Sequence, residues 1–296
     1  MIDYIVFIVY KLFVLIVKIT PKFIMKYILI GFSKLVYILD KKHRRIAMVN
    51  MDLAFEDTKS LEEKTNIIKE SYKNIVYNLY EFVVNPTLSQ SELEKKVTVE
   101  NEYIIKDAIN SKRKIILITA HYGNWELVNT FNSMKYKPMT VVGRPMSNEY
   151  LNKDLRNSRN SKNSIMLDKN NAAKGLVKAL KDDRMLALVV DQNTASNMGI
   201  LINFFNKKAR QTEAPAKLAT KFDALIIPVF VIKDDFCKYT MRFSTPIESS
   251  KFEDNSIEAI TQQQADIIEE QIRSKPEDWF WQHQRWKNQY EERYKL

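Results

Sequence analysis

The pattern of hydrophobic and polar residues divides the chain into a helical first third and a remainder in which strand and helix patterns alternate. Before residue 100, apolar residues recur every three or four positions, as in amphipathic helices. From Ile115 onward, short apolar runs alternate with helical spacing, which predicts an α/β fold with a mixed, largely parallel sheet flanked by helices. The predicted strands are 115–120, 138–143, 164–167, 185–191, 200–205, 225–232 and 238–244. The predicted helices of this part are 125–134, 148–160, 170–181, 213–222 and 256–274.

The first 19 residues are almost entirely apolar, and only lysines interrupt the later part of the run. A signal peptide places its positive charge before the apolar run and a small-residue cleavage site after it, and neither is present. We therefore predict an uncleaved membrane anchor over 1–20, a helical membrane-proximal region over 21–100 and an α/β domain over 101–296. Lys11 and Lys18 share one helix face, which favours a helix in the membrane interface but leaves a spanning helix open.

The formal net charge of +10 predicts an acidic partner. In the first fifty residues the basic side chains stand among apolar and aromatic ones, a mixture that suits anionic membrane lipids better than a nucleic acid. The basic run 41–45 is predicted to contact lipid headgroups, and no zinc finger or RNA-binding signature indicates a nucleic-acid partner. A single cysteine, Cys237, and three widely separated histidines show no metal-ligand spacing, so we expect neither a metal nor a cofactor.

The strongest candidate for chemistry is the stretch from Ile115 to Glu126. Its apolar strand stops at His121, and Tyr-Gly-Asn then supplies a turn before helical spacing begins. This places an imidazole at the carboxyl end of a central strand, where open α/β sheets bind ligands. Glu126, one helical turn later, is placed to hold the second ring nitrogen of a histidine that acts as general base. Taken alone, the pair is more typical of a buried histidine beside a carboxylate at a helix start.

Polar residues also follow two other predicted strands, with Arg144 after one and Asp191 at the end of the next. Because the carboxyl ends of parallel strands share one edge of a sheet, His121, Arg144 and Asp191 are expected to line one crevice. A base with an orienting carboxylate suits proton abstraction from a hydroxyl or amine, and Arg144 is a candidate for stabilising an oxyanion. The glycine patterns of hydrolase elbows, nucleotide-triphosphate loops and dinucleotide sites are absent from the sequence.

Two later segments carry further cations. A basic loop that includes Arg210 precedes a predicted helix start at Thr212, which suits an anion site and ordinary capping equally well. The aromatic segment 278–287 is predicted mainly as core, with Arg285 and Lys287 as candidates for contact with a phosphate or a carrier protein.

In combination, these motifs resemble those of the bacterial lipid A biosynthesis acyltransferases, the late enzymes of lauroyl or myristoyl type. The run from His121 to Glu126 matches the His-x4-Asp/Glu motif of that family in its fuller form His-x-Gly-Asn-Trp-Glu. Other matching segments follow in the family order, so the resemblance covers nearly the whole chain. They are Arg44–Leu53, Gly143-Arg144-Pro145, Asp191-Gln192, Phe204-Phe205, Thr212–Ala219, Ile227–Phe230 and Trp281–Lys287.

This resemblance implies a glycerophosphate-acyltransferase-like fold in an enzyme of the bacterial inner membrane whose catalytic body faces the cytoplasm. It implies transfer of a fatty acyl chain from acyl carrier protein to a hydroxyl of a hydroxyacyl chain on a lipid A precursor. His121 is then the general base, Glu126 orients and charges it, and Arg144 positions a phosphate or stabilises the oxyanion. The residues implied to shape the rest of the site are Asp191, Arg210 and Glu213.

Two other functions stay compatible with these residues. The first is an acyltransferase that acts on another membrane glycolipid or aminolipid. The second is a non-catalytic module that binds membranes through its basic, apolar N-terminal region. Turnover with a defined acceptor separates the enzymes from the module, and exchange of the acceptor separates the two enzymes.

Overall fold

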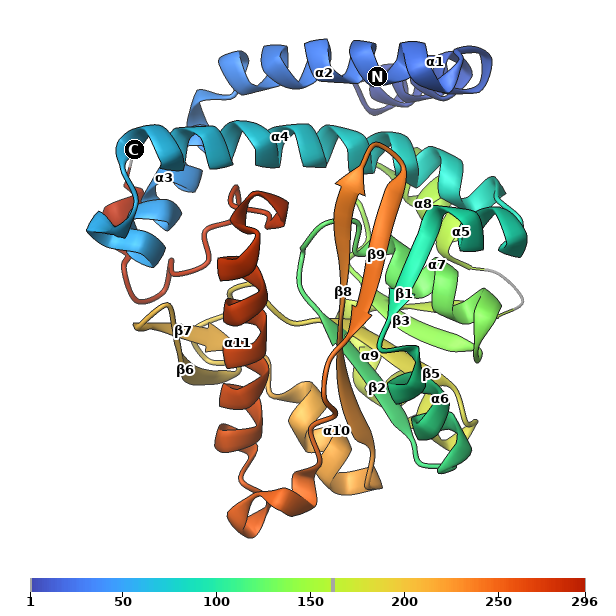
Figure 1. Cartoon of the computed structure of the whole chain (residues 1–296), viewed down its shortest axis with the longest axis vertical. Coiled ribbons are helices and arrows are strands. Elements are labelled where there is room, and N and C mark those ends of the chain that lie inside the picture. Colours follow the sequence, from blue (N-terminus) through green and yellow to red (C-terminus); the bar gives the residue numbers. More distant parts are fainter. Residues whose placement is uncertain (1, 161–162, 296) are drawn as a thin grey trace.

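Residues 2–160 and 163–295, which this computed structural model describes, form a seven-stranded sheet with helices on both faces beneath a layer of N-terminal helices (Figure 1). The helices are α1 (Ile2–Ile19), α2 (Lys22–Leu39), α3 (Lys41–Phe55), α4 (Leu61–Val84), α5 (Gln90–Lys96), α6 (Glu102–Asn110), α7 (Glu126–Lys135), α8 (Glu149–Arg159), α9 (Ala172–Lys181), α10 (Ala214–Phe222) and α11 (Ile257–Ser274). The strands are β1 (Val97–Glu100), β2 (Ile115–Thr119), β3 (Met139–Gly143), β4 (Ser164–Asp168), β5 (Met185–Val189), β6 (Ile200–Phe204), β7 (Lys207–Gln211), β8 (Leu225–Asp235) and β9 (Lys238–Phe243).

The strands of the main sheet lie in the order β1-β9-β8-β2-β5-β3-β4. Every neighbouring pair is parallel except β8 and β9, which form an antiparallel hairpin. Strands β6 and β7 pair antiparallel in a sheet of their own. The prediction of a mixed, largely parallel sheet flanked by helices is confirmed.

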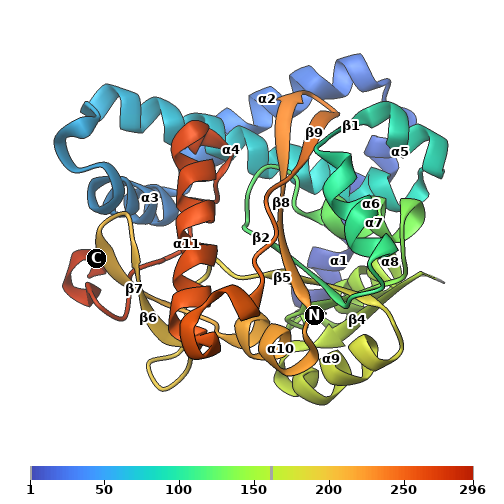
Figure 2. The same cartoon turned by 60° about the horizontal axis from the view of Figure 1, so that its bottom comes forward.

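The alternation of side chains along β2 explains why helices cover both faces. Ile116 and Ile118 belong to a core that includes residues of α9, α10 and α11. Ile115 and Leu117 belong to a second core with residues of α5, α6 and α7. A strand that is apolar at every position is the sequence pattern of a parallel sheet buried on both sides. Figure 2 shows α10 and α11 on one side of β2 and β8 and α6 and α7 on the other.

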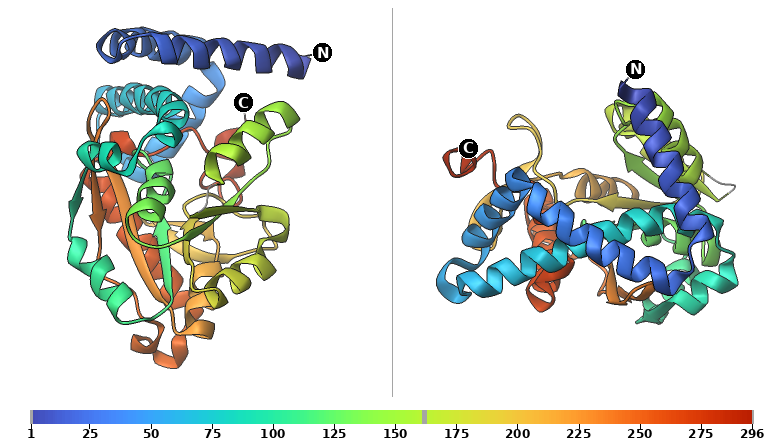
Figure 3. Two further views of the ribbon diagram at one scale, coloured as in Figure 1. Left: turned by 90° about the vertical axis from the view of Figure 1, so that its right-hand side faces the viewer. Right: turned by 90° about the horizontal axis from the view of Figure 1, so that it is seen from above.

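The N-terminal helices α1 and α2 lie on α4, away from the sheet (Figure 3). Their inner sides place Val17, Met25 and Leu29 against Val76 and Tyr77 of α4. We predicted an anchor that either spans the bilayer or lies in its interface. Among the helices of the described residues, none is long and apolar enough to cross a membrane.

Part of the basic run 41–45 has a structural role. Arg44 donates a hydrogen bond to the carbonyl oxygen of Ile38 at 2.6 Å, and its guanidinium lies 4.9 Å from the ring centroid of Tyr37. Arg45 donates to the carbonyl oxygen of Lys295 at 2.7 Å. These two arginines therefore satisfy carbonyl groups at the end of α2 and near the C-terminus, whereas the lysines that precede them are exposed.

The predicted strands and helices after Ile115 are all found, with ends that differ by a few residues. Two strands were not predicted. Strand β1 is a short edge strand within a region that the pattern made entirely helical. Strand β7 lies in the segment predicted as a basic loop, and Ala209 and Gln211 are its only buried positions, so it lacks the apolar run that predicts a strand.

Candidate active site

The turn that joins β2 to α7, residues 121–124, is held tightly against β8 and the C-terminal segment. Gly123 adopts a φ of +52°, and a Cβ at this position would lie 1.7 Å from the carbonyl oxygen of Val231. Its N–H donates to the carbonyl oxygen of Asp278 at 2.7 Å. Glycine is therefore required here for both backbone conformation and close approach, and the turn fixes the position of His121.

The residue that holds the imidazole is Asp191. Its Oδ1 lies 2.8 Å from Nδ1 of His121, and its Oδ2 accepts the backbone N–H of the same histidine at 3.0 Å. The parallel register explains the contact: Thr119 of β2 lies beside Val189 of β5, so the residues two positions further along are also neighbours. The sequence-based expectation that two polar strand ends meet is thus met for this pair.

Asp191 is charged in the folded protein. Its side chain is only 3% exposed. This burial alone raises the pKa of the carboxyl, but the imidazole of His121 and the hydrogen bonds from His121 and Trp279 outweigh it and hold the pKa at about 2. A carboxylate in this position stabilises the imidazolium that forms when the histidine accepts a proton. Within the described residues, no three His, Cys, Asp or Glu side chains gather in a way that could hold a metal ion.

The other ring nitrogen of His121 contacts Gln192. Its Nε2 lies 3.3 Å from Nε2 of Gln192, whose amide N–H can donate to the nitrogen lone pair. Trp125 meets the imidazole edge-on with ring centroids 5.1 Å apart, and Phe280 lies at 6.2 Å. These contacts suit a tautomer with the proton on Nδ1, in which the lone pair of Nε2 accepts from Gln192 beside an aromatic surface and is the candidate base.

Glu126 is the first residue of α7 and is partly buried. The resemblance assigned it the task of orienting the imidazole. The two ring nitrogens of His121 instead face Asp191 and Gln192, so the task of holding Nδ1 falls to Asp191. The physical reason is the strand pairing, because the register of β2 and β5 brings Asp191 beside His121.

Arg144 follows β3 at the same end of the sheet and is exposed. Its positive charge contributes to the lowered pKa of His283, so these two side chains lie near each other. Burial is the main cause of that pKa, which is about 4. His283 is therefore neutral, and its Nε2 accepts the backbone N–H of Asn193 at 3.2 Å. The C-terminal segment thus holds the loop that follows Asp191.

The remaining predicted site residues contact other parts of the chain. Arg210 on β7 donates to the carbonyl oxygen of Gly199 at 3.1 Å. Glu213, just before α10, pairs with Lys217. Arg285 was a candidate for a surface phosphate contact, but it is fully buried and donates to the backbone of Arg210. Within the described residues, none of these three is bonded to His121 or Asp191.

Three residues of the site were not predicted as such. Gln192 directly follows Asp191, so the strand-end argument applied one residue further would have included it. His283 lies in the matching segment Trp281–Lys287, but no pattern linked it to the site, and Trp279 had no signal of its own. The hydrogen bond from Trp279 to Asp191 joins residues 88 positions apart, and that from Asn193 to His283 joins residues 90 positions apart, so only the tertiary fold reveals them.

Comparison with known proteins identifies a family whose sequence model matches the chain. Residues 1–288 match the profile described as "Bacterial lipid A biosynthesis acyltransferase". The chain belongs to this family.

Individual relatives agree with that assignment. The chain is 24% identical over 249 residues to the lipid A biosynthesis palmitoleoyltransferase of Escherichia coli (strain K12), and the match covers 83% of this chain and 79% of the relative. The same values hold for the lipid A biosynthesis acyltransferase of Shigella flexneri. A phosphatidylinositol mannoside acyltransferase of Mycolicibacterium smegmatis is 25% identical over 206 residues, or 68% of this chain and 66% of the relative. The protein is accordingly an acyltransferase that acts on lipid-like acceptors.

Proposed function

We propose that the protein transfers a fatty acyl chain from acyl carrier protein to a hydroxyl of a hydroxyacyl chain on a lipid A precursor. Membership of the family supports the reaction class and the type of acceptor. The observation that carries the chemistry is the contact of Nδ1 of His121 with buried Asp191, which leaves Nε2 as a base at the carboxyl end of the sheet. A hydroxyl needs such a base to become a nucleophile.

In this reaction the acceptor hydroxyl takes the place of the Gln192 amide at Nε2 of His121. The hydroxyl proton moves to Nε2 while the oxygen attacks the thioester carbonyl carbon, and a tetrahedral oxyanion forms. The charge of Asp191 stabilises the imidazolium at this stage. The carbon–sulfur bond then breaks, and His121 returns the proton to the departing thiolate of the carrier.

Further residues complete this site. Arg144, which is exposed and forms no ion pair within the described residues, binds a phosphate of the lipid acceptor or stabilises the oxyanion. Glu126, at the start of α7 and next to Trp125, whose ring packs on His121, is proposed as a second carboxylate that helps to charge the imidazole. Arg210 and Glu213, which do not bond to His121 or Asp191 within the described residues, are proposed to shape the wall of the site.

The site works at the cytoplasmic side of the bacterial inner membrane, with α1 and α2 in the lipid interface. The placement in the lipid interface rests on the apolar side chains that these helices expose and on their position at the outside of the molecule (Figure 3). Val9 is 61% exposed, Phe23 69% and Tyr27 72%. An amphipathic helix with exposed apolar residues and flanking lysines binds the headgroup region of anionic bilayers without spanning them. This arrangement presents the catalytic body to an acceptor whose acyl chains stay in the bilayer.

The donor is acidic, as is the phosphorylated acceptor, and the net charge of +10 complements both. The test is turnover by the purified protein in mixed micelles that contain a tetra-acylated lipid A precursor and an acyl-acyl carrier protein. Mass spectrometry should show one added acyl chain that depends on the carrier. If no acyl-acyl carrier protein yields the acylated product, the proposed combination of donor and acceptor is wrong.

A second acceptor class is supported by the similarity to a phosphatidylinositol mannoside acyltransferase. Its acceptor is a glycolipid without a lipid A backbone, and the same base could act on a sugar hydroxyl. Exchange of the acceptor in the assay above separates the two functions. Acylation of a phosphatidylinositol mannoside but not of the lipid A precursor would favour this second function.

A further inference from the structure

The two carboxylate oxygens of Asp191 have different partners. Oδ1 lies 2.8 Å from Nδ1 of His121. Oδ2 accepts the indole N–H of Trp279 at 2.7 Å and the backbone N–H of His121 at 3.0 Å. Because the Asp191 side chain is 3% exposed, there is little water to replace a lost donor. A rotation of the carboxylate breaks both bonds to Oδ2, so these donors set the orientation in which Oδ1 faces the imidazole.

We infer that Trp279 is a positioning residue for acyl transfer, whose indole N–H fixes the carboxylate of Asp191 toward His121. The inference rests on the proposed function of the His121–Asp191 pair. It adds a residue that acts on the imidazole through Asp191 and needs no contact with the substrate.

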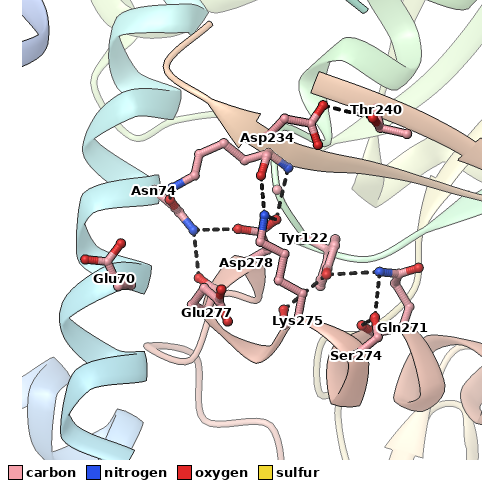
Figure 4. A network of polar contacts seen from close by, with 12 residues as sticks. Glu70, Asn74, Tyr122, Asp234, Thr240, Gln271, Ser274, Lys275, Glu277 and Asp278 are labelled. Atoms are coloured by element: carbon pink, nitrogen blue, oxygen red, sulfur yellow. Dashed lines mark hydrogen bonds and ion pairs between the residues drawn. The ribbon is translucent and has the colours of Figure 1, made fainter. Parts of the chain in front are cut away.

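The residue before Trp279 anchors it to the rest of the fold. The side chain of Asp278 is fully buried and accepts the side-chain amide of Asn74 at 2.8 Å and the backbone N–H of Lys233 at 3.0 Å. Its carbonyl oxygen accepts the N–H of Gly123 at 2.7 Å. Figure 4 shows this carboxylate within the polar network between α4 and the C-terminal segment. Asp278 therefore ties the segment to α4, β8 and the catalytic turn together.

The segment also runs directly beside the catalytic turn. Trp279 forms an antiparallel bridge with Tyr122, and the N–H of Phe280 donates to the carbonyl oxygen of His121 at 2.9 Å. The hydroxyl of Tyr122 donates to the carbonyl oxygen of Lys275 at 3.1 Å (Figure 4). These bonds at several points fix the backbone on both sides of the indole. The indole is thus held by the same framework that holds His121, which is the arrangement that a positioning residue requires.

A neighbouring tryptophan provides a matched control. Trp281 is fully buried, and its ring centroid lies 4.5 Å from that of Trp279. Its indole N–H donates to the carbonyl oxygen of Pro276 at 2.7 Å, the same length as the bond from Trp279. Replacement of either tryptophan by phenylalanine removes one buried indole and one hydrogen bond. Only the replacement at 279 removes a donor to Asp191.

The experiment compares the wild type, W279F and W281F. Steady-state kinetics with acyl-acyl carrier protein and lipid A precursor give kcat and KM, and proton NMR follows the downfield Nδ1–H resonance of His121. We expect W279F to lower kcat by about tenfold or more with KM nearly unchanged, because a lost hydrogen bond to a buried charge misplaces the base. Its Nδ1–H resonance should broaden or disappear. W281F should stay within about threefold of the wild-type kcat and keep the resonance.

A second test uses the isosteric variant D191N, in which both tryptophans are kept, so it does not depend on the folding of a tryptophan variant. In D191N the indole N–H resonance of Trp279 should shift, because its acceptor loses charge, and that of Trp281 should not. Equal kcat values for W279F and W281F, or an unmoved Trp279 indole resonance in D191N, overturn the inference. If the wild type acylates no acceptor, the proposed function fails, and the two resonances still decide whether Trp279 positions Asp191.

Discussion

Replacement of Asp191 by asparagine keeps the shape of the side chain and removes the charge that faces His121. In the wild type, Oδ1 of this carboxylate lies 2.8 Å from Nδ1 of the imidazole. The charge of an imidazolium is spread over the ring, so the centres of the two charges are about 4 Å apart, where the attraction at an effective dielectric constant of about 20 is worth about 4 kcal/mol. Most of this attraction exists only after the base has accepted a proton. The loss therefore falls on the barrier, and kcat should decrease by about a thousandfold.

The assay is kcat for D191N with the lipid A precursor, together with thermal unfolding. D168N is the matched control, because Asp168 also stands at the carboxyl end of a strand of the same sheet. Its Oδ1 accepts the backbone N–H of Asn170 at 2.9 Å, and the side chain has no bond to His121 within the described residues. We expect D168N to keep nearly full activity. A D191N protein that folds and keeps more than about a tenth of the wild-type kcat would refute the role of the carboxylate charge.

Three further predictions concern the turn and its surroundings. E126A should abolish acyl transfer while the protein still unfolds cooperatively, because Glu126 is proposed as a second carboxylate of the site. E126Q should keep the Nδ1–H resonance of His121, because Nδ1 contacts Asp191. Full activity of E126A would exclude Glu126 from the mechanism. G123A should lower the free energy of unfolding by more than about 2 kcal/mol in denaturant titrations, because its Cβ meets the Val231 carbonyl oxygen and its φ is positive; an unchanged midpoint would contradict this. Burial lowers the pKa of His283 from 6.5 to about 4. As the pH falls, the unfolded chain therefore binds a proton at a higher pH than the folded protein does. The contribution of His283 to the free energy of unfolding is complete above pH 6.5 and is lost as the pH falls toward 4. H283Q should remove up to about 3 kcal/mol of this dependence in unfolding titrations between pH 7 and 4, and an identical slope in the variant would show that His283 is not its source.

Much of the fold follows from local patterns. The apolar run of β2 is buried at all five positions, and this continuous burial is what distinguishes a central parallel strand from an edge strand. Strand β7, in contrast, is mostly polar. It is stabilised by its antiparallel pairing with β6 and by burial of Ala209, and neither leaves an apolar run in the sequence. Local periodicity cannot reveal a strand whose stability comes from its partner.

The residues of the candidate site likewise differ in whether a local sequence pattern could predict them. His121 and Asp191 were predictable because each ends an apolar strand, and parallel strands bring their ends together. Sequence proximity favoured Glu126 as the partner of the imidazole, whereas the register of β2 and β5 supplies Asp191. The contribution of Trp279 depends on the path of the C-terminal segment beside the catalytic turn, which no local pattern encodes. An aromatic-rich segment is read as core, and here the same side chain is both core and hydrogen-bond donor.

In the proposed reaction, His121 drives the acylation of a lipid A precursor. The most direct measurement is mass spectrometry of lipid A from a strain that lacks this protein, complemented with the wild type, with H121A or with H43A. Because His43 is exposed and pairs with Asp40 in the N-terminal region, H43A is the matched control. We predict that the deletion removes the mass of one acyl chain and that the wild type and H43A restore it while H121A does not. Unchanged lipid A in the deletion strain, or restoration by H121A, would contradict the account.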